Sequence, residues 1–255
     1  MAYNLYTSIL QAKQQQQKQF VVLLDPDKLR LSNIDRVLHL ASQAKVDYFF
    51  VGGSLVVSDM LDQCIKTIKS STSIPVILFP GDISQINYSA DAILYLSLIS
   101  GRNPDLLIGK HVVSAPLLYK SKLEIISTGY MLIDGGRSTT ASYMSGTFPL
   151  PADKEDIALC TALAGEMLGM KLIYMDAGSG AQNPISERMI STVAEHISIP
   201  LVIGGGIRTP EKALKNVQAG ADVIVIGNAI EKDPILIAEM AAAIHSMNAP
   251  LVYSK

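Results

Sequence analysis

The chain contains two apolar runs near its end, LVIGGG (201–206) and VIVIGN (223–228). In both runs the apolar residues are followed directly by glycine. Apolar runs of this kind are typical of fully buried parallel strands. Glycine at a strand end lets the backbone approach a ligand closely. In an eight-stranded β/α barrel, the loops after strands seven and eight, with the start of a short extra helix, form a recurrent phosphate site. The pair therefore predicts such a site, provided that six strands precede it.

Six further runs of the same character do precede it. They are FVVLLD (20–25), YFFVGG (48–53), PVILFPG (75–81), AILYLSLISG (92–101), EIISTGYMLIDGG (124–136) and LIYMDAG (172–178). Between most of them lie stretches with helical periodicity and helix-start signals, such as Thr209 before Pro210, which is the βαβ order of a parallel sheet. With no Pro/Ser-rich or charged linker, the chain is predicted to form one α/β domain over residues 1–255, a closed (β/α)8 TIM barrel.

Two intervals depart from this rhythm. The segment GDISQINYSAD (81–91) has no apolar face at helical spacing, so we expect the third helix of the barrel to be missing or reduced. The segment GGRSTTASYMSGTFPLPAD (135–153) is predicted to be a long loop, and long loops often border functional sites. Near the start of the chain, the glutamines 14–17 are expected to continue a short amphipathic helix.

The composition limits the partners of the chain. Of its 255 residues, 49% are hydrophobic and 17% are charged, with a net charge of −2. This balance offers no general attraction for nucleic acid or an anionic membrane. The polar N-terminus has no signal-peptide pattern, and no apolar run is long enough to span a bilayer, so we expect a cytoplasmic protein. Cys64 and Cys160 lack metal-ligand spacing and are predicted to be free thiols.

Seven segments, in order along nearly the whole chain, carry a family resemblance. They are LLDPDK (23–28), FVGGS (50–54), LISGRNPDLLIGKH (98–111), STGYMLIDGG (127–136), YMDAGSGA (174–181), GGGIRTPEKA (204–213) and VIGNAIE (225–231). Together they resemble geranylgeranylglyceryl phosphate synthase and the bacterial enzymes similar to it, notably heptaprenylglyceryl phosphate synthase. The resemblance implies a barrel in which helix three is replaced.

The resemblance also implies an activity. It is the Mg²⁺-dependent transfer of a prenyl group, with geranylgeranyl diphosphate as the first candidate donor, to a hydroxyl of sn-glycerol 1-phosphate. Diphosphate is released, and the ether product belongs to phospholipid biosynthesis. A homo-oligomer, either a dimer or a hexamer, and a transient contact of the enzyme with a membrane surface are further implications.

The phosphate site is expected at Gly205, Gly206, Gly227 and Asn228, whose backbone N–H groups would hold the glycerol phosphate dianion. Taken alone, either glycine motif could be only a tight turn. Two such motifs on adjacent final strands favour phosphate binding, but they do not specify the reaction, because unrelated barrel enzymes share this arrangement.

A metal site is expected at the ends of the first two strands. Asp25 should point into the barrel mouth, and Ser54 supplies a second oxygen in the family pattern. Mg²⁺ favours one or two carboxylates together with waters and phosphate oxygens. Asp25–Pro26–Asp27 could instead be a turn with capping carboxylates. Asp27 and Lys28 are expected in the loop, behind the metal ligands.

The segment YMDAGSGA (174–181) is the most informative about mechanism. Tyr174 and Asp176 should face the same way along a strand. Asp176 is the candidate catalytic residue, as a general base for the glycerol hydroxyl, as a stabiliser of positive charge on the allylic carbon, or as a group that positions the glycerol hydroxyls. The resemblance implies glutamate here in many family members, so the shorter aspartate leaves these roles open. The segment's predicted substrate-binding residues are Tyr174, Met175, Asp176, Ala177, Gly178, Ser179 and Gly180.

The prenyl chain needs an apolar groove, which the reduced third helix would open. Candidate lining residues are Phe79, Tyr88, Tyr95, Leu98, Tyr130 and Leu132. Arg102 and Asn103 are candidates to contact the diphosphate or to order the rim. Surface or packing roles are expected for the four histidines, which lack metal-ligand spacing.

Two other functions share the predicted phosphate site. One is a phosphosugar isomerase, an aldolase or a flavin-binding barrel, although no lysine stands at a strand end as a clear Schiff-base candidate. The other is a binding protein without catalytic activity. A visible spectrum would reveal a flavin, and glycerol phosphate binding without turnover would indicate the binding protein.

Overall fold

Eight parallel strands close into a barrel in a computed structural model that describes residues 4–27, 31–56 and 60–248, with residues 31–33 described by their backbone alone. Each strand pairs with its neighbours in the chain, and the first pairs with the last. The strands are β1 (Gln19–Leu24), β2 (Tyr48–Val51), β3 (Val76–Leu78), β4 (Ala92–Leu98), β5 (Glu124–Leu132), β6 (Leu172–Asp176), β7 (Leu201–Gly204) and β8 (Val223–Ile226). The predicted barrel is confirmed: seven of the eight predicted runs contain a whole strand, and β1 begins one residue before its run.

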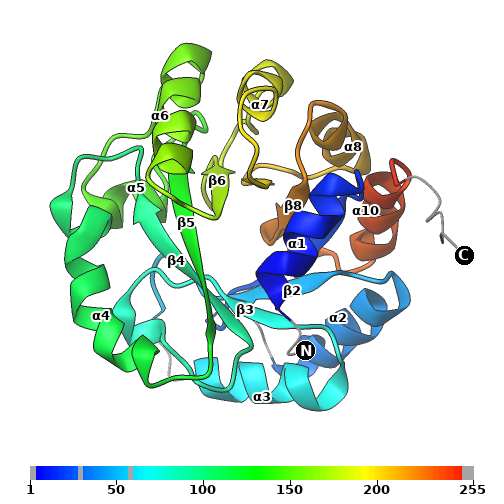
Figure 1. Cartoon of the computed structure of the whole chain (residues 1–255). Coiled ribbons are helices and arrows are strands. Elements are labelled where there is room, and N and C mark those ends of the chain that lie inside the picture. Colours follow the sequence, from blue (N-terminus) through cyan, green and yellow to red (C-terminus); the bar gives the residue numbers. More distant parts are fainter. Residues whose placement is uncertain (1–3, 28–30, 57–59, 249–255) are drawn as a thin grey trace, which may run out of the picture.

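Helices surround the barrel on its outer side (Figure 1). They are α1 (Leu5–Gln14), α2 (Leu31–Gln43), α3 (Leu61–Ser71), α4 (Lys110–Tyr119), α5 (Thr140–Ser145), α6 (Glu155–Met167), α7 (Glu187–Ala194), α8 (Pro210–Gln218), α9 (Asn228–Lys232) and α10 (Leu236–His245). Helix α8 begins as the sequence predicts, because the Thr209 side chain accepts a hydrogen bond from Lys212 N–H and Pro210 follows it. None of the described helices is long and apolar enough to cross a membrane.

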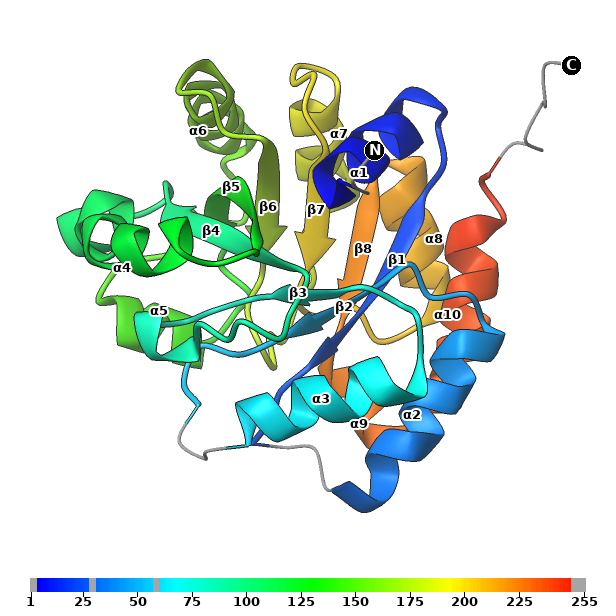
Figure 2. The same ribbon diagram turned by 60° about the horizontal axis from the view of Figure 1, so that its bottom comes forward.

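The strands place their side chains in two apolar layers. Alternate residues point into the barrel or outward against the helices, as the pleat requires. Thus Val21 and Tyr174 belong to the interior layer, whereas Val22 and Met175 pack in the layer between strands and helices. Figure 2 shows β6, β7, β8 and β1 side by side, with α7, α8 and α10 against them. This alternation decides which residues of a strand can reach a ligand at the mouth.

Helix α1 lies across the N-terminal end of the barrel (Figure 1). Leu5 and Ile9 are each 3% exposed and join the interior layer. The carboxylate of Glu124, at the start of β5, accepts hydrogen bonds from the N–H groups of Leu5 at 2.6 Å and Tyr6 at 2.9 Å. The prediction that the helix continues through residues 14–17 is wrong: it ends at Gln14, and Gln16 has φ of 55° as the chain turns into β1.

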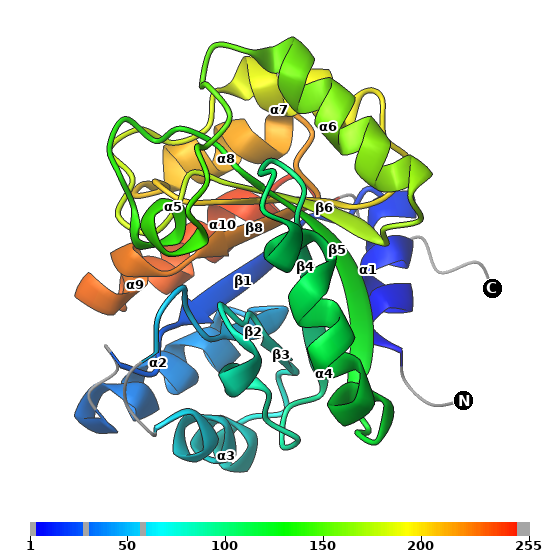
Figure 3. The ribbon, with the colours of Figure 1, turned by 90° about the vertical axis from the view of Figure 1, so that its left-hand side faces the viewer.

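The crossover from β3 to β4 contains no α-helix, only a single 3-10 turn, Ile83–Gln85. Figure 3 faces this side of the molecule, where α3 and α4 lie on either side of the crossover. The buried Gln85 side chain explains the local structure: its Oε1 accepts hydrogen bonds from Gly53 and Gly81 N–H, and its Nε2 donates to Gly53 O. The expected reduction of the third helix is therefore confirmed.

The predicted long loop after β5 is not wholly a loop, because α5 lies within it. Its capping box is formed by Thr139 and Ser142, and Gly146, with φ of 60°, ends the helix. The helix is only six residues long, which is why its periodicity escapes notice in the sequence.

Candidate active site

Two cavities adjoin at the C-terminal ends of the strands. One, of about 620 Å³, is bordered by the ends of β1 and β6–β8; the other, of about 320 Å³, extends beneath the reduced third crossover and α4. Gly53, Ser54, Leu55 and Phe79 line both. We call the first the polar cavity and the second the apolar cavity.

Glycines after β6, β7 and β8 border the polar cavity. Gly178, Gly180, Gly205 and Gly206 have φ between +72° and +87°, a conformation that side chains other than glycine disfavour. The peptide N–H groups of Gly180, Gly205, Gly206 and Gly227 donate to no other group in the described parts of the chain. Ser179 and Asn228 also line this cavity, and the Ser179 hydroxyl donates to Asn228 Oδ1 at 3.2 Å. These N–H groups suit a bound anion.

Asp176 ends β6 and lines the polar cavity, although only 7% of its surface is exposed. Its Oδ1 accepts the N–H of Gly178 at 2.7 Å, and its Oδ2 accepts the hydroxyl of Tyr130 at 2.7 Å. Burial raises the pKa of Asp176, while these two hydrogen bonds act in the opposite direction. The carboxylate is thus a stronger base than an exposed aspartate.

Two tyrosines inside the barrel adjoin Asp176. Tyr174 faces the polar cavity, as predicted from its parity with Asp176, and its ring lies 5.5 Å from that of Tyr130. Burial, with the nearby Asp176 charge, raises the pKa of both phenols, so both stay protonated at neutral pH. The sequence analysis named Tyr130 only as a groove residue. The strand register indicates its second role, because Tyr130 lies opposite Tyr174 on β6, two residues before Asp176.

The side chains of Met175 and Ala177 do not line the polar cavity, so a contact of these residues with the substrate stays a prediction for their backbone groups alone. Both side chains lie in the apolar layer between the strands and the helices, 0% and 1% exposed. The physical reason is strand alternation: residues 174 and 176 point inward, so their neighbours point outward.

Asp25 and Ser54 follow the ends of β1 and β2, on the side of the polar cavity. Both line the polar cavity, and Ser54 lines the apolar cavity as well. A Cβ placed on Gly53 would lie 3.5 Å from Oδ2 of Asp25, so the carboxylate adjoins the residue before Ser54. A carboxylate and a hydroxyl in the lining of one cavity are oxygen ligands of the kind that Mg²⁺ takes together with waters and phosphate oxygens. Asp25 Oδ1 also accepts the N–H of Asp27, whereas Lys28 lies outside the described residues.

Most of the predicted groove residues line the apolar cavity. Those that do are Phe79, Tyr95, Leu98, Tyr130 and Leu132. Tyr88 does not; it is 59% exposed, because the short crossover turns it to the surface. Asn103 orders the rim by donating to Ser145 O at 3.0 Å, and Arg102 donates to the carbonyl oxygen of Gly101.

One of the four histidines, His111, lies in the apolar cavity, although the sequence predicts only surface or packing roles for them. His111 on α4 lines the apolar cavity, with its ring 4.5 Å from that of Tyr95 and its Nε2 3.1 Å from Ser97 Oγ. His245, by contrast, pairs with Asp47 on the outer side. Both thiols are free: Cys64 is buried, with a pKa raised to about 11 chiefly by desolvation, and Cys160 is exposed.

Comparison with known proteins gives one consistent result. The model of the PcrB family matches residues 12–247. The geranylgeranylglyceryl phosphate synthase of Chitinophaga pinensis is 58% identical over 246 residues, 96% of this chain and 98% of that protein. The corresponding synthase of Spirosoma linguale is 54% identical over 92% of this chain and 94% of its own.

A solved structure is similar over the whole barrel. It is the (S)-3-O-geranylgeranylglyceryl phosphate synthase of Thermoplasma acidophilum in complex with sn-glycerol-1-phosphate. The TM-score is 0.90 at 31% identity, with 96% of this chain and 99% of that chain covered.

Proposed function

The chain belongs to the PcrB family, and we propose that it joins a polyprenyl diphosphate to sn-glycerol 1-phosphate through an ether bond, releasing diphosphate. Geranylgeranyl diphosphate is the first candidate donor, because the similar proteins are named geranylgeranylglyceryl phosphate synthase. The similar Thermoplasma structure contains the proposed acceptor. The isomerase, aldolase, flavin-barrel and non-catalytic alternatives rest only on the phosphate site, which the family shares with unrelated barrels.

The observation that carries this proposal is the junction of the two cavities. A prenyl diphosphate has a long apolar chain and an anionic end, and the acceptor is small and anionic. The apolar cavity offers the surface of Phe79, Leu98 and Leu132 to the chain, and the polar cavity offers unpaired glycine N–H groups to the phosphate. The reacting ends of the two substrates would meet at Gly53, Ser54 and Phe79, which line both cavities.

Asp176 is the proposed base. The oxygen of a glycerol hydroxyl forms the new bond to the first prenyl carbon, the bond from that carbon to the diphosphate breaks, and the hydroxyl proton passes to the carboxylate. Tyr130 fixes the orientation of the carboxylate through its 2.7 Å hydrogen bond. Because the aspartate is held from two sides, its remaining lone pairs are directed toward the polar cavity that it lines.

We further propose that the reaction depends on Mg²⁺, held by Asp25 and Ser54 at the junction of the cavities. When bound, the ion supplies positive charge to the departing diphosphate. The proposal is supported by the position of Asp25, which lines the polar cavity with its carboxylate close to Gly53.

Product formation tests the proposal. Purified protein, Mg²⁺, sn-glycerol 1-phosphate and prenyl diphosphates of increasing length should give an ether-linked lipid phosphate, detected by mass spectrometry. We expect Asp25→Ala to lower turnover by about 10²-fold or more while changing glycerol phosphate affinity little. Chelation of divalent cations should lower turnover of the wild-type protein similarly. Folded protein that makes no product at any chain length would refute the function; equal turnover of the variant would refute only the metal role.

A homo-oligomer and a transient membrane contact are two further proposals about assembly. They are supported by the exposed apolar side chains of Val112, Val113 and Leu117 on α4, next to the apolar cavity. Light scattering of the purified protein measures the oligomer, and sedimentation with lipid vesicles measures the contact.

A further inference from the structure

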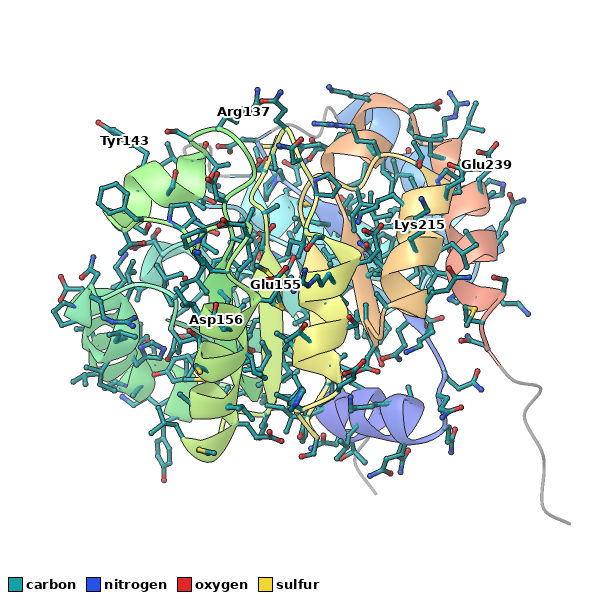
Figure 4. All side chains as sticks on the ribbon, turned by 90° about the horizontal axis from the view of Figure 1, so that it is seen from above. Arg137, Tyr143, Glu155, Asp156, Lys215 and Glu239 are labelled. Atoms are coloured by element: carbon teal, nitrogen blue, oxygen red, sulfur yellow. The ribbon has the colours of Figure 1, made fainter. Side chains whose placement is uncertain are left out.

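Arg137 stands over the polar cavity and has no role in the function described so far. It follows β5 in the segment before α5, and it lines the polar cavity together with the glycines after β6 and β7. A Cβ placed on Gly180 would lie 2.5 Å from Nη2 of Arg137 and 3.7 Å from Nδ2 of Asn228. The guanidinium therefore lies directly beside the loop whose N–H groups suit an anion. In Figure 4, Arg137 is at the rim, next to the loop after β6.

The loop that carries Arg137 is fixed to the loop beneath it. Gly135 O accepts hydrogen bonds from both Gln182 N–H and Asn183 N–H, each at 2.9 Å. The side chain of Asp134 accepts the N–H of Gly136 at 2.9 Å. Because the backbone on the N-terminal side of Arg137 is held in this way, the guanidinium needs only its own side-chain torsions to reach the cavity.

The guanidinium of Arg137 also lacks a partner. Among the described residues it forms no hydrogen bond and no ion pair. Arg208, which lines the same cavity, differs in this respect, because it donates to the carbonyl oxygens of Ala181 and Gln182 and so supports the loop. An unpaired guanidinium presents five donors suited to phosphate oxygens.

The charge of the cavity indicates why such a residue is needed. Its lining contains the carboxylates Asp25, Asp176, Glu231 and Asp233 and the cations Arg137, Arg208 and Lys232. A phosphate dianion that enters the cavity therefore meets more carboxylates than cations and is repelled by the excess negative charge. Backbone N–H groups carry only partial charge, and Arg208 is already engaged with carbonyl oxygens. A free cation beside Gly180 offsets the repulsion.

We propose that Arg137, from the loop after β5, binds the phosphate of glycerol phosphate beside Gly180, together with the glycine N–H groups of the polar cavity. This inference rests on the proposed function and adds one residue to its acceptor site. Arg137 contributes to affinity for the acceptor through charge-assisted hydrogen bonds and takes no part in the proton transfer at Asp176. The prenyl diphosphate lies on the other side, at Asp25 and Ser54, so its binding does not depend on Arg137.

The test is calorimetric titration of sn-glycerol 1-phosphate into the wild-type protein and three variants. Arg137→Gln should raise the Kd about 10- to 100-fold, and Arg137→Lys should raise it less, since one point charge remains. Lys232→Gln removes an equal charge from the same cavity, and we expect a rise of about fivefold at most. The KM for the prenyl diphosphate should stay constant in Arg137→Gln, and kcat should change little.

Three outcomes would overturn the inference. They are an unchanged Kd in Arg137→Gln, an equal loss in Lys232→Gln, and a rise confined to the KM of the prenyl diphosphate. Each leaves the proposed function standing if the wild-type protein forms the ether product. Wild-type protein that binds glycerol phosphate but makes no product would refute the function and leave the role of Arg137 measurable. Thermal unfolding of Arg137→Gln should match wild type, because its guanidinium contacts no described partner.

Discussion

At the scale of single residues, the chemistry depends on the surroundings of Asp176. An exposed aspartate is a weak base near neutral pH. Inside the barrel, loss of water raises its pKa, and the Tyr130 hydroxyl and the Gly178 N–H limit that rise. Burial thus makes the Asp176 carboxylate a stronger base, and the two hydrogen bonds favour its ionised form. The aspartate side chain is held in place by Tyr130, a residue from the adjacent strand.

Asp176→Asn should separate catalysis from stability. We expect turnover to fall about 10²- to 10⁴-fold, because the amide cannot accept the hydroxyl proton. A raised pKa in the folded state means that stability is lost as pH rises from the ordinary value of 3.8 through the folded value. Asparagine removes this loss and can still pair with Gly178 and Tyr130. Its unfolding temperature at neutral pH should therefore equal or exceed that of wild type.

Tyr130→Phe is the matched control for the pH dependence. It keeps the carboxylate but removes a hydrogen bond that lowers its pKa. The acidic limb of the profile of kcat against pH should move to higher pH, because Asp176 must be deprotonated to act. A limb that stays in place would show that another group controls it.

At the scale of elements, the loops after β6 and β7 lie against each other in the lining of the polar cavity, where we propose that the phosphate binds. Gly205 has φ of +79°, and a Cβ there would lie 2.5 Å from Oδ1 of Asp176 and 2.7 Å from the backbone nitrogens of Ala177 and Gly178. The glycine thus serves two purposes: it permits the left-handed turn and leaves room for the Asp176 carboxylate.

Gly205→Ala should therefore weaken both stability and binding. The left-handed conformation alone costs about 1–2 kcal/mol with a side chain, and the clash adds to it. We expect glycerol phosphate affinity to fall about tenfold or more, since a shift of this loop displaces its N–H donors. Gly169→Ala is the control, because Gly169 has φ of +82° and open space around its Cβ position. It should lose stability alone, as measured by urea unfolding and titration; a similar loss of affinity in both variants would contradict this account.

At the scale of the whole molecule, stability and function occupy opposite ends of the barrel. Helix α1 closes the N-terminal end, where Leu5 and Ile9 are buried and Glu124 caps the first turn. The cavities and all the proposed catalytic groups lie at the C-terminal end. This separation is general for TIM barrels.

Ile9→Ala should accordingly lower stability without altering the reaction. Removing the buried side chain should cost about 2–4 kcal/mol of unfolding free energy. For a chain of this size, that corresponds to roughly 2–4 °C in Tm for each kcal/mol. The KM of both substrates should remain unchanged under conditions where the variant is folded. Ile157→Ala, at a position 41% exposed on α6, should cost about 0.5 kcal/mol or less. A changed KM in Ile9→Ala would show that the two ends are coupled.

Much of the fold follows from local patterns. Eight apolar runs, the poor helical character of residues 81–91 and the glycines at strand ends are visible in the sequence, because strand burial and glycine conformation depend on residue type and spacing. Helix α5 was missed, since six residues give too little periodicity. The inward position of Tyr174 follows from strand alternation and is confirmed, and the same alternation turns the side chains of Met175 and Ala177 outward.

The sequence by itself determined the barrel from eight apolar runs, the reduced third helix from residues 81–91, Asp25 and Asp176 as candidates from their places at strand ends, and Ser54 from the family resemblance. Only the tertiary structure decided that Tyr130 holds Asp176, that Gly53 and Ser54 lie where the two cavities meet, and that Arg137 overlies Gly180. Those contacts join residues that are distant along the chain. Their distances depend on how a closed barrel brings neighbouring strand ends together, which local spacing does not encode.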